Sequence, residues 1–258
     1  MPLRRRYRRR LCSAAAVSGV GSRRVVRHTF GAHQIDIAMP TAAVKPGVTG
    51  EAPENDTTGM QIWPSALRIC EFLSLSVDSP KWRVAVPPAE FLPAWATTKV
   101  LELGCGSCAA GGILAAKLGA ESVHFTDGNP AALKTAAENV HLNCDGAAVF
   151  VDLLRWGDQD SVERLQNTSS QVDLIIGSDL LYAEKTHAAL LATVSAFAGA
   201  NTKVLLAYRP RYPAERGRFV SAAESKGLEV QHLAMYGDTG SSWEHIEMIA
   251  LAPCGATQ

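Results

Sequence analysis

The chain has 258 residues, of which 47% are apolar and 19% charged, and its formal net charge is zero. This size and composition predict a soluble α/β protein with one large domain or two small ones. Its apolar runs are far shorter than the roughly 20 residues that span a bilayer, so we expect no transmembrane helix and no membrane partner.

The charge is distributed unevenly along the chain. Nine arginines lie between Arg4 and Arg27, and the first acidic residue is Asp36, so the remainder carries 16 basic against 25 acidic residues. Nucleic-acid enzymes need a basic footprint, and we therefore expect no nucleic-acid partner. Residues 1–28, rich in Arg, Ala and Ser, predict a basic disordered arm or a mitochondrial targeting segment.

The cysteines are scattered and no secretory signal precedes them, which favours a reducing compartment over a disulfide framework. They are Cys12, Cys70, Cys105, Cys108, Cys144 and Cys254. We expect a cytoplasmic protein, with the nucleus as a further compartment; the alternative is import into mitochondria through the arginine-rich terminus.

Residues 29–98 form an N-terminal segment ahead of the regular part of the chain. Residues 29–39 alternate apolar and polar side chains and predict a strand or hairpin. Pro64 suits the first turn of an amphipathic helix, and four prolines within residues 78–95 indicate an irregular linker.

Residues 99–258 alternate short apolar runs with helical stretches. Strands are predicted at 100–103, 122–127, 147–154, 172–178, 203–208, 228–235 and 245–252, and helices at 111–120, 130–143, 185–200 and 216–227. Alternating βα units predict a parallel doubly wound sheet, and the last two strands, with no helix between them, predict an antiparallel hairpin at one edge. The fold class is therefore α/β, with a Rossmann-like seven-stranded sheet.

The loop after the first core strand, VLELGCGSCAAGG at 100–112, admits four chemical interpretations. A redox CxxC pair lacks its usual flanking aromatic residue and proline. A zinc site needs about four ligands, and no second paired motif supplies them, so we expect no metal. A dinucleotide loop and a methyl-donor loop remain.

Glu102 and Asp127 separate those two interpretations. Gly104 and Gly106 fit a dinucleotide loop, but an acid at Glu102 would repel a pyrophosphate and favour the sulfonium and ammonium of S-adenosylmethionine. Asp127, at a strand end, is placed to accept hydrogen bonds from ribose hydroxyls. Alternatively, Glu102 is a solvated strand end and Asp127 a helix cap. Both acids together favour the methyl donor.

The motifs GMQIWPSA, VLELGCGSCAAGG, FTDGN, DLLRWGD, GSDLLY and LAYRPR resemble those of the seven-stranded, class I methyltransferases. Within that class the sequence is most similar to the protein-lysine methyltransferases of methyltransferase family 16, the branch that includes calmodulin-lysine methyltransferase, over about residues 59–253. The resemblance implies S-adenosylmethionine as cofactor and a monomer that methylates a protein, with calmodulin as the best single candidate and another protein as the alternative.

The resemblance also assigns site residues. It implies that the donor contacts Trp63, Glu102, Gly104, Gly106, Asp127, Trp156 and Ser178, and that the catalytic residues are Asp179 and Tyr182 of the D-x-x-Y motif. Cys108 departs from the pattern, because many relatives have a third glycine there, and its side chain would crowd the methionine part of the donor.

Lysine attacks only as the neutral amine. A free lysine is protonated at neutral pH, because its ammonium has a pKa of about 10.4. We expect Asp179 to orient the incoming ammonium and Tyr182 to form part of an aromatic lysine channel; alternatively, Asp179 caps the next helix and Tyr182 packs on the sheet. A nucleic-acid amino-methyltransferase would show [DN]-P-P-[YF] where SDLLY stands. An NAD-dependent oxidoreductase, the rival enzyme class, would need a substrate domain and a catalytic Tyr/Lys or His, and the sequence indicates neither.

Overall fold

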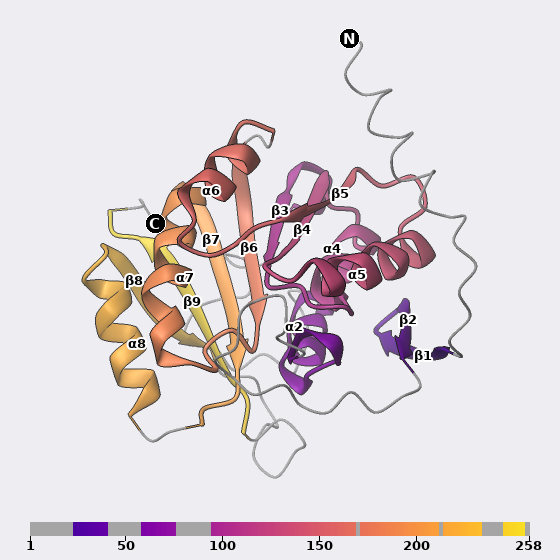
Figure 1. The fold of residues 1–258 in the computed structure, drawn as a ribbon, viewed down its shortest axis with the longest axis horizontal. Coiled ribbons are helices and arrows are strands. Elements are labelled where there is room, and N and C mark those ends of the chain that lie inside the picture. The colour runs from indigo at the N-terminus through magenta and orange to yellow at the C-terminus, as the bar shows by residue number, and fades with distance from the viewer. Residues whose placement is uncertain are drawn as a thin grey trace.

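A seven-stranded sheet forms the centre of the computed structural model, which describes residues 23–40, 58–75, 94–168, 171–211, 214–233 and 245–255 (Figure 1). The strand order is β5-β4-β3-β6-β7-β9-β8. The strands are β3 (Lys99–Leu103), β4 (Ser122–Asp127), β5 (Val149–Leu153), β6 (Val172–Ser178), β7 (Ala198–Tyr208), β8 (Leu228–Leu233) and β9 (Glu247–Pro253). The pairs from β5 to β7 are parallel, whereas β9 runs antiparallel between β7 and β8. The predicted fold class, including the antiparallel hairpin, is confirmed.

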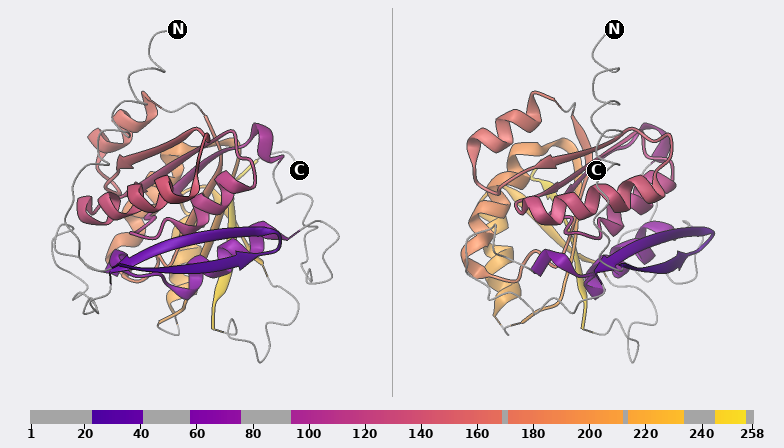
Figure 2. Two further views of the ribbon diagram at one scale, coloured as in Figure 1. Left: turned by 90° about the vertical axis from the view of Figure 1, so that its right-hand side faces the viewer. Right: turned by 45° about the vertical axis from the view of Figure 1, so that its right-hand side comes forward.

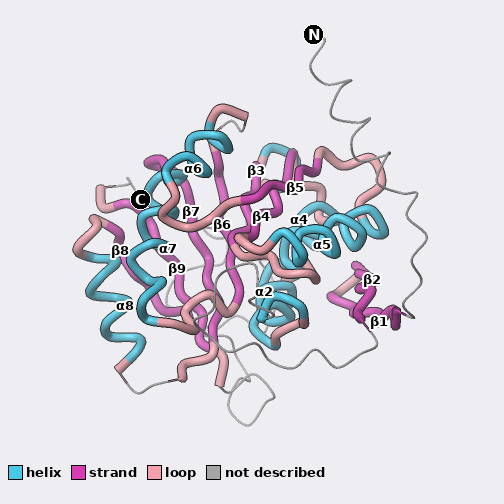
Figure 3. Tube along the Cα trace, in the orientation of Figure 1, coloured by secondary structure: helices cyan, strands magenta, loops and turns pink. Residues whose placement is uncertain are grey.

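Helices cover both faces of this sheet (Figures 1 and 3). One face carries α2 (Pro64–Ser74), α4 (Ala110–Lys117) and α5 (Pro130–Asn143); the other carries α6 (Gln159–Gln166), α7 (Glu184–Phe197) and α8 (Glu215–Glu224). Each face has its own cluster of buried apolar side chains. The near-continuous apolar runs of β3 and β6 follow from this double covering.

Local sequence signals account for the helix starts. Pro130 opens α5, and the side chain of Asn129 caps it by accepting bonds from the N–H groups of Ala131 at 2.8 Å and Ala132 at 3.3 Å. Helix α6 was not expected from the sequence. It buries only Ser161, Val162 and Leu165, too few apolar side chains to show a helical period.

The N-terminal hairpin pairs β1 (Arg23–Phe30) with β2 (His33–Pro40). Because β1 starts at Arg23, the last residues of the expected arm 1–28 belong to a strand, and Arg27 forms an ion pair with Asp36 across the hairpin at 2.7 Å. Figure 2 shows the hairpin alongside α2 and α5, and β2 buries Ile35 and Ile37 in the core that α4 and α5 share.

Two short 3₁₀ helices, η1 (Thr58–Met60) and η2 (Trp95–Thr97), precede α2 and β3 respectively. Most of the expected linker 78–95, the first 22 residues of the expected arm and the end of the predicted strand 228–235 lie outside the described residues. Within the described ranges, no helix combines the length and apolar character that crossing a bilayer requires.

Candidate active site

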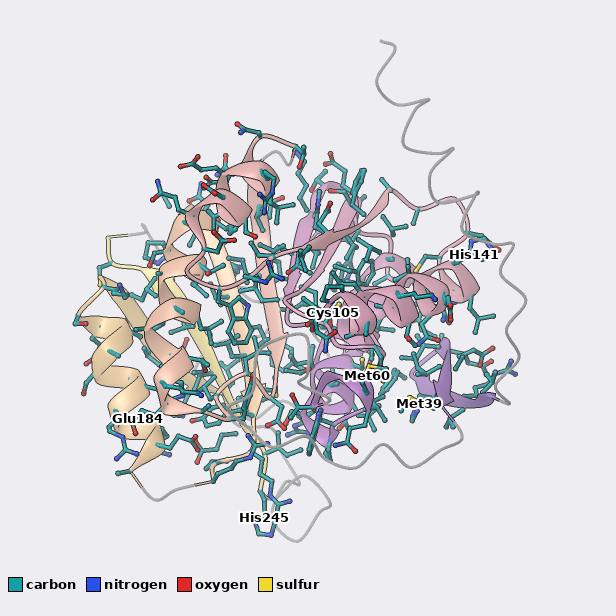
Figure 4. All side chains as sticks on the ribbon, in the orientation of Figure 1. Met39, Met60, Cys105, His141, Glu184 and His245 are labelled. Carbon is teal, nitrogen blue, oxygen red and sulfur yellow. The ribbon has the colours of Figure 1, made fainter. Side chains whose placement is uncertain are left out.

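A cavity of about 680 Å³ opens at the carboxyl ends of β3, β4 and β6. This edge holds the point where the sheet order reverses, since β3 pairs with β4 on one side and β6 on the other, and ligands of open α/β sheets bind at such points. Residues 58, 59 and 61–63, ahead of α2, supply a further wall. Cys105, on this cavity, lies near the centre of the molecule (Figure 4).

Eight of the nine predicted site residues line this cavity: Trp63, Gly104, Gly106, Asp127, Trp156, Ser178, Asp179 and Tyr182. The ninth, Glu102, does not. The cavity also includes Thr58, Gly59 and Arg211, which are not among those nine residues. Their signals were the start of the family motif at Gly59 and the Arg-Pro-Arg sequence after β7.

The loop after β3 needs glycine at two positions. Gly104 and Gly106 have φ values of +57° and +58°. A Cβ on Gly104 would lie 2.6 Å from Leu180 Cδ2, and one on Gly106 would lie 2.9 Å from the carbonyl oxygen of Gly59. The loop and η1 thus approach backbone to backbone, and the Ser107 N–H donates to that Gly59 oxygen at 2.6 Å.

Asp127 faces the cavity and holds the loop at the same time. Its Oδ2 accepts from the Gly106 N–H at 2.9 Å and its Oδ1 from the Asn129 N–H at 2.8 Å. A carboxylate oxygen can accept more than one hydrogen bond, so the side chain that holds the loop can also contact a ligand diol. Because Asn129 caps α5, the interpretation of Asp127 as the cap of that helix is wrong.

The position of Glu102 differs from both expectations for it, a contact with the methyl donor and a solvated strand end. Glu102 is 3% exposed and lies under the first turn of α4, where its Oε2 accepts from the Gly112 N–H at 3.1 Å. Burial raises its pKa to about 8, although the N–H groups of Gly112 and Gly111 oppose the rise. The carboxyl is therefore largely neutral at pH 7. It is also turned away from the cavity, because alternate residues of β3 face opposite sides of the sheet. Its charge cannot separate a methyl donor from a dinucleotide.

The two cysteines of the loop are buried thiols. Burial raises the pKa of Cys105 well above its usual value and that of Cys108 to about 11, which argues against a redox pair. Cys108 Sγ lies 3.4 Å from Met39 Sδ on β2, so it packs against the hairpin as well as lining the cavity. Among the described residues, no group of His, Cys, Asp and Glu side chains is arranged to hold a metal ion.

Asp179 adopts a strained conformation at the end of β6. Its φ is +57°, in the left-handed region that costs a non-glycine residue on the order of 1 kcal/mol and is enriched at functional sites. Its N–H donates to the Ala207 carbonyl at 2.7 Å, and its Oδ1 accepts from the Arg209 N–H at 3.3 Å. The next helix, α7, has Ala183 as its N-cap without a side-chain bond, so Asp179 does not cap it.

Asp179, Trp63 and Tyr182 converge on one cationic group, the guanidinium of Arg211. Its Nη2 donates to Asp179 Oδ2 at 3.0 Å, and its central carbon lies 5.8 Å from the Trp63 ring centroid and 6.0 Å from that of Tyr182. A carboxylate beside two aromatic faces is a favourable environment for a cation. This cation site opens onto the same cavity as the glycine loop.

A family model described as lysine methyltransferase matches residues 48–226. Protein N-lysine methyltransferase METTL21A of Danio rerio is 34% identical over 58% of this chain and 61% of its own. EEF1A lysine methyltransferase 3 of Mus musculus is 33% identical over 61% and 57%. Calmodulin-lysine N-methyltransferase of Arabidopsis thaliana is 32% identical over 37% and 31%. The chain thus spans less than two thirds of the length of each of these relatives.

Solved structures show the same fold. A protein of Streptococcus mutans assigned as a SAM-dependent methyltransferase superposes with a TM-score of 0.58 at 12% identity, over 92% of this chain and 57% of that one. At this identity the likeness concerns the fold alone.

Proposed function

Because the chain belongs to the lysine methyltransferase family, we propose that it transfers a methyl group from S-adenosylmethionine to a lysine side chain of a protein substrate. The observation that carries the proposal is the shared cavity. The glycine loop, which packs closely against its neighbours, and the site for one cation both open onto it. The buried Glu102 no longer argues against a pyrophosphate. The family match is therefore what favours the methyl donor over a dinucleotide.

The residues present fit the methyl donor. Gly104 and Gly106 line the cavity without a side chain, Asp127 offers a carboxylate for the ribose hydroxyls, and Trp156 offers an aromatic face for the adenine. The volume of about 680 Å³ lies within the range of roughly 300–1,000 Å³ that is usual for such ligands. When bound, S-adenosylmethionine supplies an electrophilic methyl group on a sulfonium.

On the substrate side, this chain's residues align the lysine nitrogen. Asp179 accepts a hydrogen bond from the incoming ammonium, and Trp63 and Tyr182 hold the end of the side chain between their rings. The ammonium then loses a proton to water, and the neutral nitrogen can attack the electrophilic methyl group. Alignment is the main contribution of the protein, because the methyl group is already activated.

The substrate proposals are narrower. Calmodulin is the best single candidate, on the motif resemblance and the match to the Arabidopsis enzyme, and EEF1A is the alternative named by the mouse relative. We further propose a monomer that acts in the cytoplasm and also in the nucleus, with mitochondria as the alternative location.

Two measurements test the proposed function. In the first, tritiated S-adenosylmethionine is incubated with the protein and with a cell lysate, purified calmodulin or EEF1A, and the transfer of labelled methyl groups to protein is measured. In the second, the binding of S-adenosylhomocysteine is measured by calorimetry. Asp179→Ala should abolish transfer to lysine and leave the dissociation constant within about threefold. Asp160→Ala, an exposed residue of α6, is the matched control. Unchanged transfer by Asp179→Ala would refute the role of Asp179.

A further inference from the structure

Arg211 lies between two hollows of the molecule. One is the cavity of the candidate active site; the other is an open groove of about 890 Å³ formed by the end of β7, the start of α8 and β9. The groove is lined by Pro210, Arg211, Ala214, Arg216, Gly217, Arg218 and Glu247. Of the described residues, Arg211 alone lines both hollows.

The backbone of Arg211 is fixed, whereas its side chain has room to move. The Arg211 N–H donates to Oε2 of Glu215 at 2.7 Å, and Glu215 is 2% exposed at the start of α8. The Arg211 side chain is 31% exposed, against 6% for its partner Asp179. A change of side-chain rotamer, without backbone movement, is therefore enough to withdraw the guanidinium from Asp179.

The cation site holds one charged group. The guanidinium of Arg211 takes the Asp179 carboxylate and lies over both rings, so a lysine ammonium cannot make the same contacts while Arg211 stays. Lysine binding at Asp179 therefore requires Arg211 to leave.

A displaced Arg211 needs a new partner. The other groove arginines are already paired, Arg216 with Glu247 at 3.6 Å and Arg218 with Glu184 at 2.9 Å, and Glu247 also accepts from Tyr208 Oη at 2.7 Å. Glu184 lies at the α7–α8 side of the molecule (Figure 4). Among the described residues, the carboxylates beside the groove are thus engaged, and an acidic side chain of the substrate is the partner that keeps the displaced guanidinium in an ion pair.

We infer that Arg211 is a gate that occupies the site of the substrate lysine, and that the substrate segment carries an acidic residue beside that lysine to receive the displaced guanidinium. The inference rests on the proposed function and adds to it the class of sequence that the enzyme selects. On binding, the pair between Asp179 and Arg211 is exchanged for two pairs, Asp179 with lysine and Arg211 with the acidic residue.

The first test uses n-butylamine as a probe of the cation site, titrated by NMR with S-adenosylhomocysteine at saturation. Arg211→Gln should bind the amine about tenfold more tightly than wild type, because the competing cation is gone. Arg218→Gln removes the same charge from the same groove without touching Asp179, and should bind like wild type. Equal or weaker binding by Arg211→Gln would overturn the gate.

The second test compares two peptides, Ac-Gly-Glu-Lys-Gly-amide and Ac-Gly-Gln-Lys-Gly-amide. Wild type and Arg218→Gln should bind the glutamate peptide more tightly than the glutamine peptide, and Arg211→Gln should bind the two equally. A preference that survives in Arg211→Gln would refute the ion-pair exchange. Arg211→Met, with a side chain of similar reach, repeats both tests should the first variant unfold.

The outcome separates this inference from the proposed function. If the amine binds more tightly to Arg211→Gln but no protein of the lysate is methylated, the gate stands and the lysine methyltransferase activity falls. If methylation occurs and Arg211→Gln shows no gain, the activity stands and the gate falls.

Discussion

The side-chain amide of Asn139 joins the N-terminal hairpin to the glycine loop, because it donates to the carbonyl of Ser107 at 2.8 Å while contacting β2. Its Oδ1 accepts from the Ala38 N–H at 2.8 Å. Asn143, one helical turn later, binds the same strand through the Asp36 N–H at 2.8 Å and the Asp36 carbonyl at 2.7 Å. Two asparagines of α5 thus satisfy the edge of β2, but only Asn139 also reaches the loop.

Asn139→Ala should therefore weaken donor binding as well as stability. Each buried polar group left without a partner costs about 1–3 kcal/mol, and Asn139 is fully buried. We expect about a tenfold rise in the dissociation constant of S-adenosylhomocysteine, measured by calorimetry, and a loss of unfolding free energy in urea.

Asn143→Ala is the control for that experiment, because it breaks the hairpin bonds and spares the Ser107 contact. It should lower stability with at most about a threefold change in donor affinity. Equal weakening of donor binding by the two variants would show that hairpin docking, rather than the contact with Ser107, sets the affinity.

Glu102 should make the stability of the protein depend on pH. Its pKa is about 8 in the folded protein against an ordinary value of 4.5, so the folded state binds the proton more tightly. Its contribution is fully present below about pH 4.5 and is lost as the pH rises toward 8, by at most about 1.4 kcal/mol per pH unit.

Glu102→Gln, which mimics the neutral acid, should remove this loss. Urea unfolding at a series of pH values between about 5 and 8.5 measures it. The free energies of the two proteins should converge at the acidic end and separate in favour of the variant at the basic end. Glu121→Gln, a half-exposed residue paired with Lys99, should run parallel to wild type. Parallel curves for Glu102→Gln would contradict the raised pKa.

Gly106→Ala should disrupt the loop through two effects. The residue has a φ of +58°, and its new Cβ would meet the Gly59 oxygen at 2.9 Å. We expect a loss of about 1–3 kcal/mol in unfolding free energy and more than about tenfold in affinity for S-adenosylhomocysteine. Gly146→Ala isolates the first effect, because Gly146 has a φ of +80° and nothing within 4 Å of the added Cβ. Donor binding that survives Gly106→Ala would mean that η1 can withdraw without harm.

Elements with strong local signals could be predicted from the sequence. The predicted bounds of β4, α5 and β6 agree with the structure, since an apolar run or a proline with a capping residue marks each. Helix α6 was missed because it buries few apolar side chains. Residues at strand ends were predicted to meet, and Gly104, Asp127 and Asp179 do line one cavity, because parallel strands bring their carboxyl ends to one edge.

Orientation and long-range contact could not be predicted in the same way. Strand alternation places Glu102 on one face of β3 but does not tell which face the ligand approaches. The packing of Arg211 between Trp63 and Tyr182 brings together three segments that are distant in the chain, and no local pattern records that meeting. The hairpin likewise needs Asn139 of α5 to complete its edge.

Tyr182 should act through its aromatic face rather than its hydroxyl. The ring lies 6.0 Å from the guanidinium carbon of Arg211, at a distance suited to attraction of a cation, which is worth about 0.5–2 kcal/mol. Tyr182→Phe keeps the ring and should retain methyl transfer to lysine within about threefold, whereas Tyr182→Ala should lower kcat/KM by about tenfold or more. Both variants should bind S-adenosylhomocysteine as wild type does, which calorimetry checks. Steady-state transfer of tritiated methyl groups to the substrate protein measures the difference. If Tyr182→Phe falls as far as Tyr182→Ala, the hydroxyl carries the role and the aromatic channel is wrong.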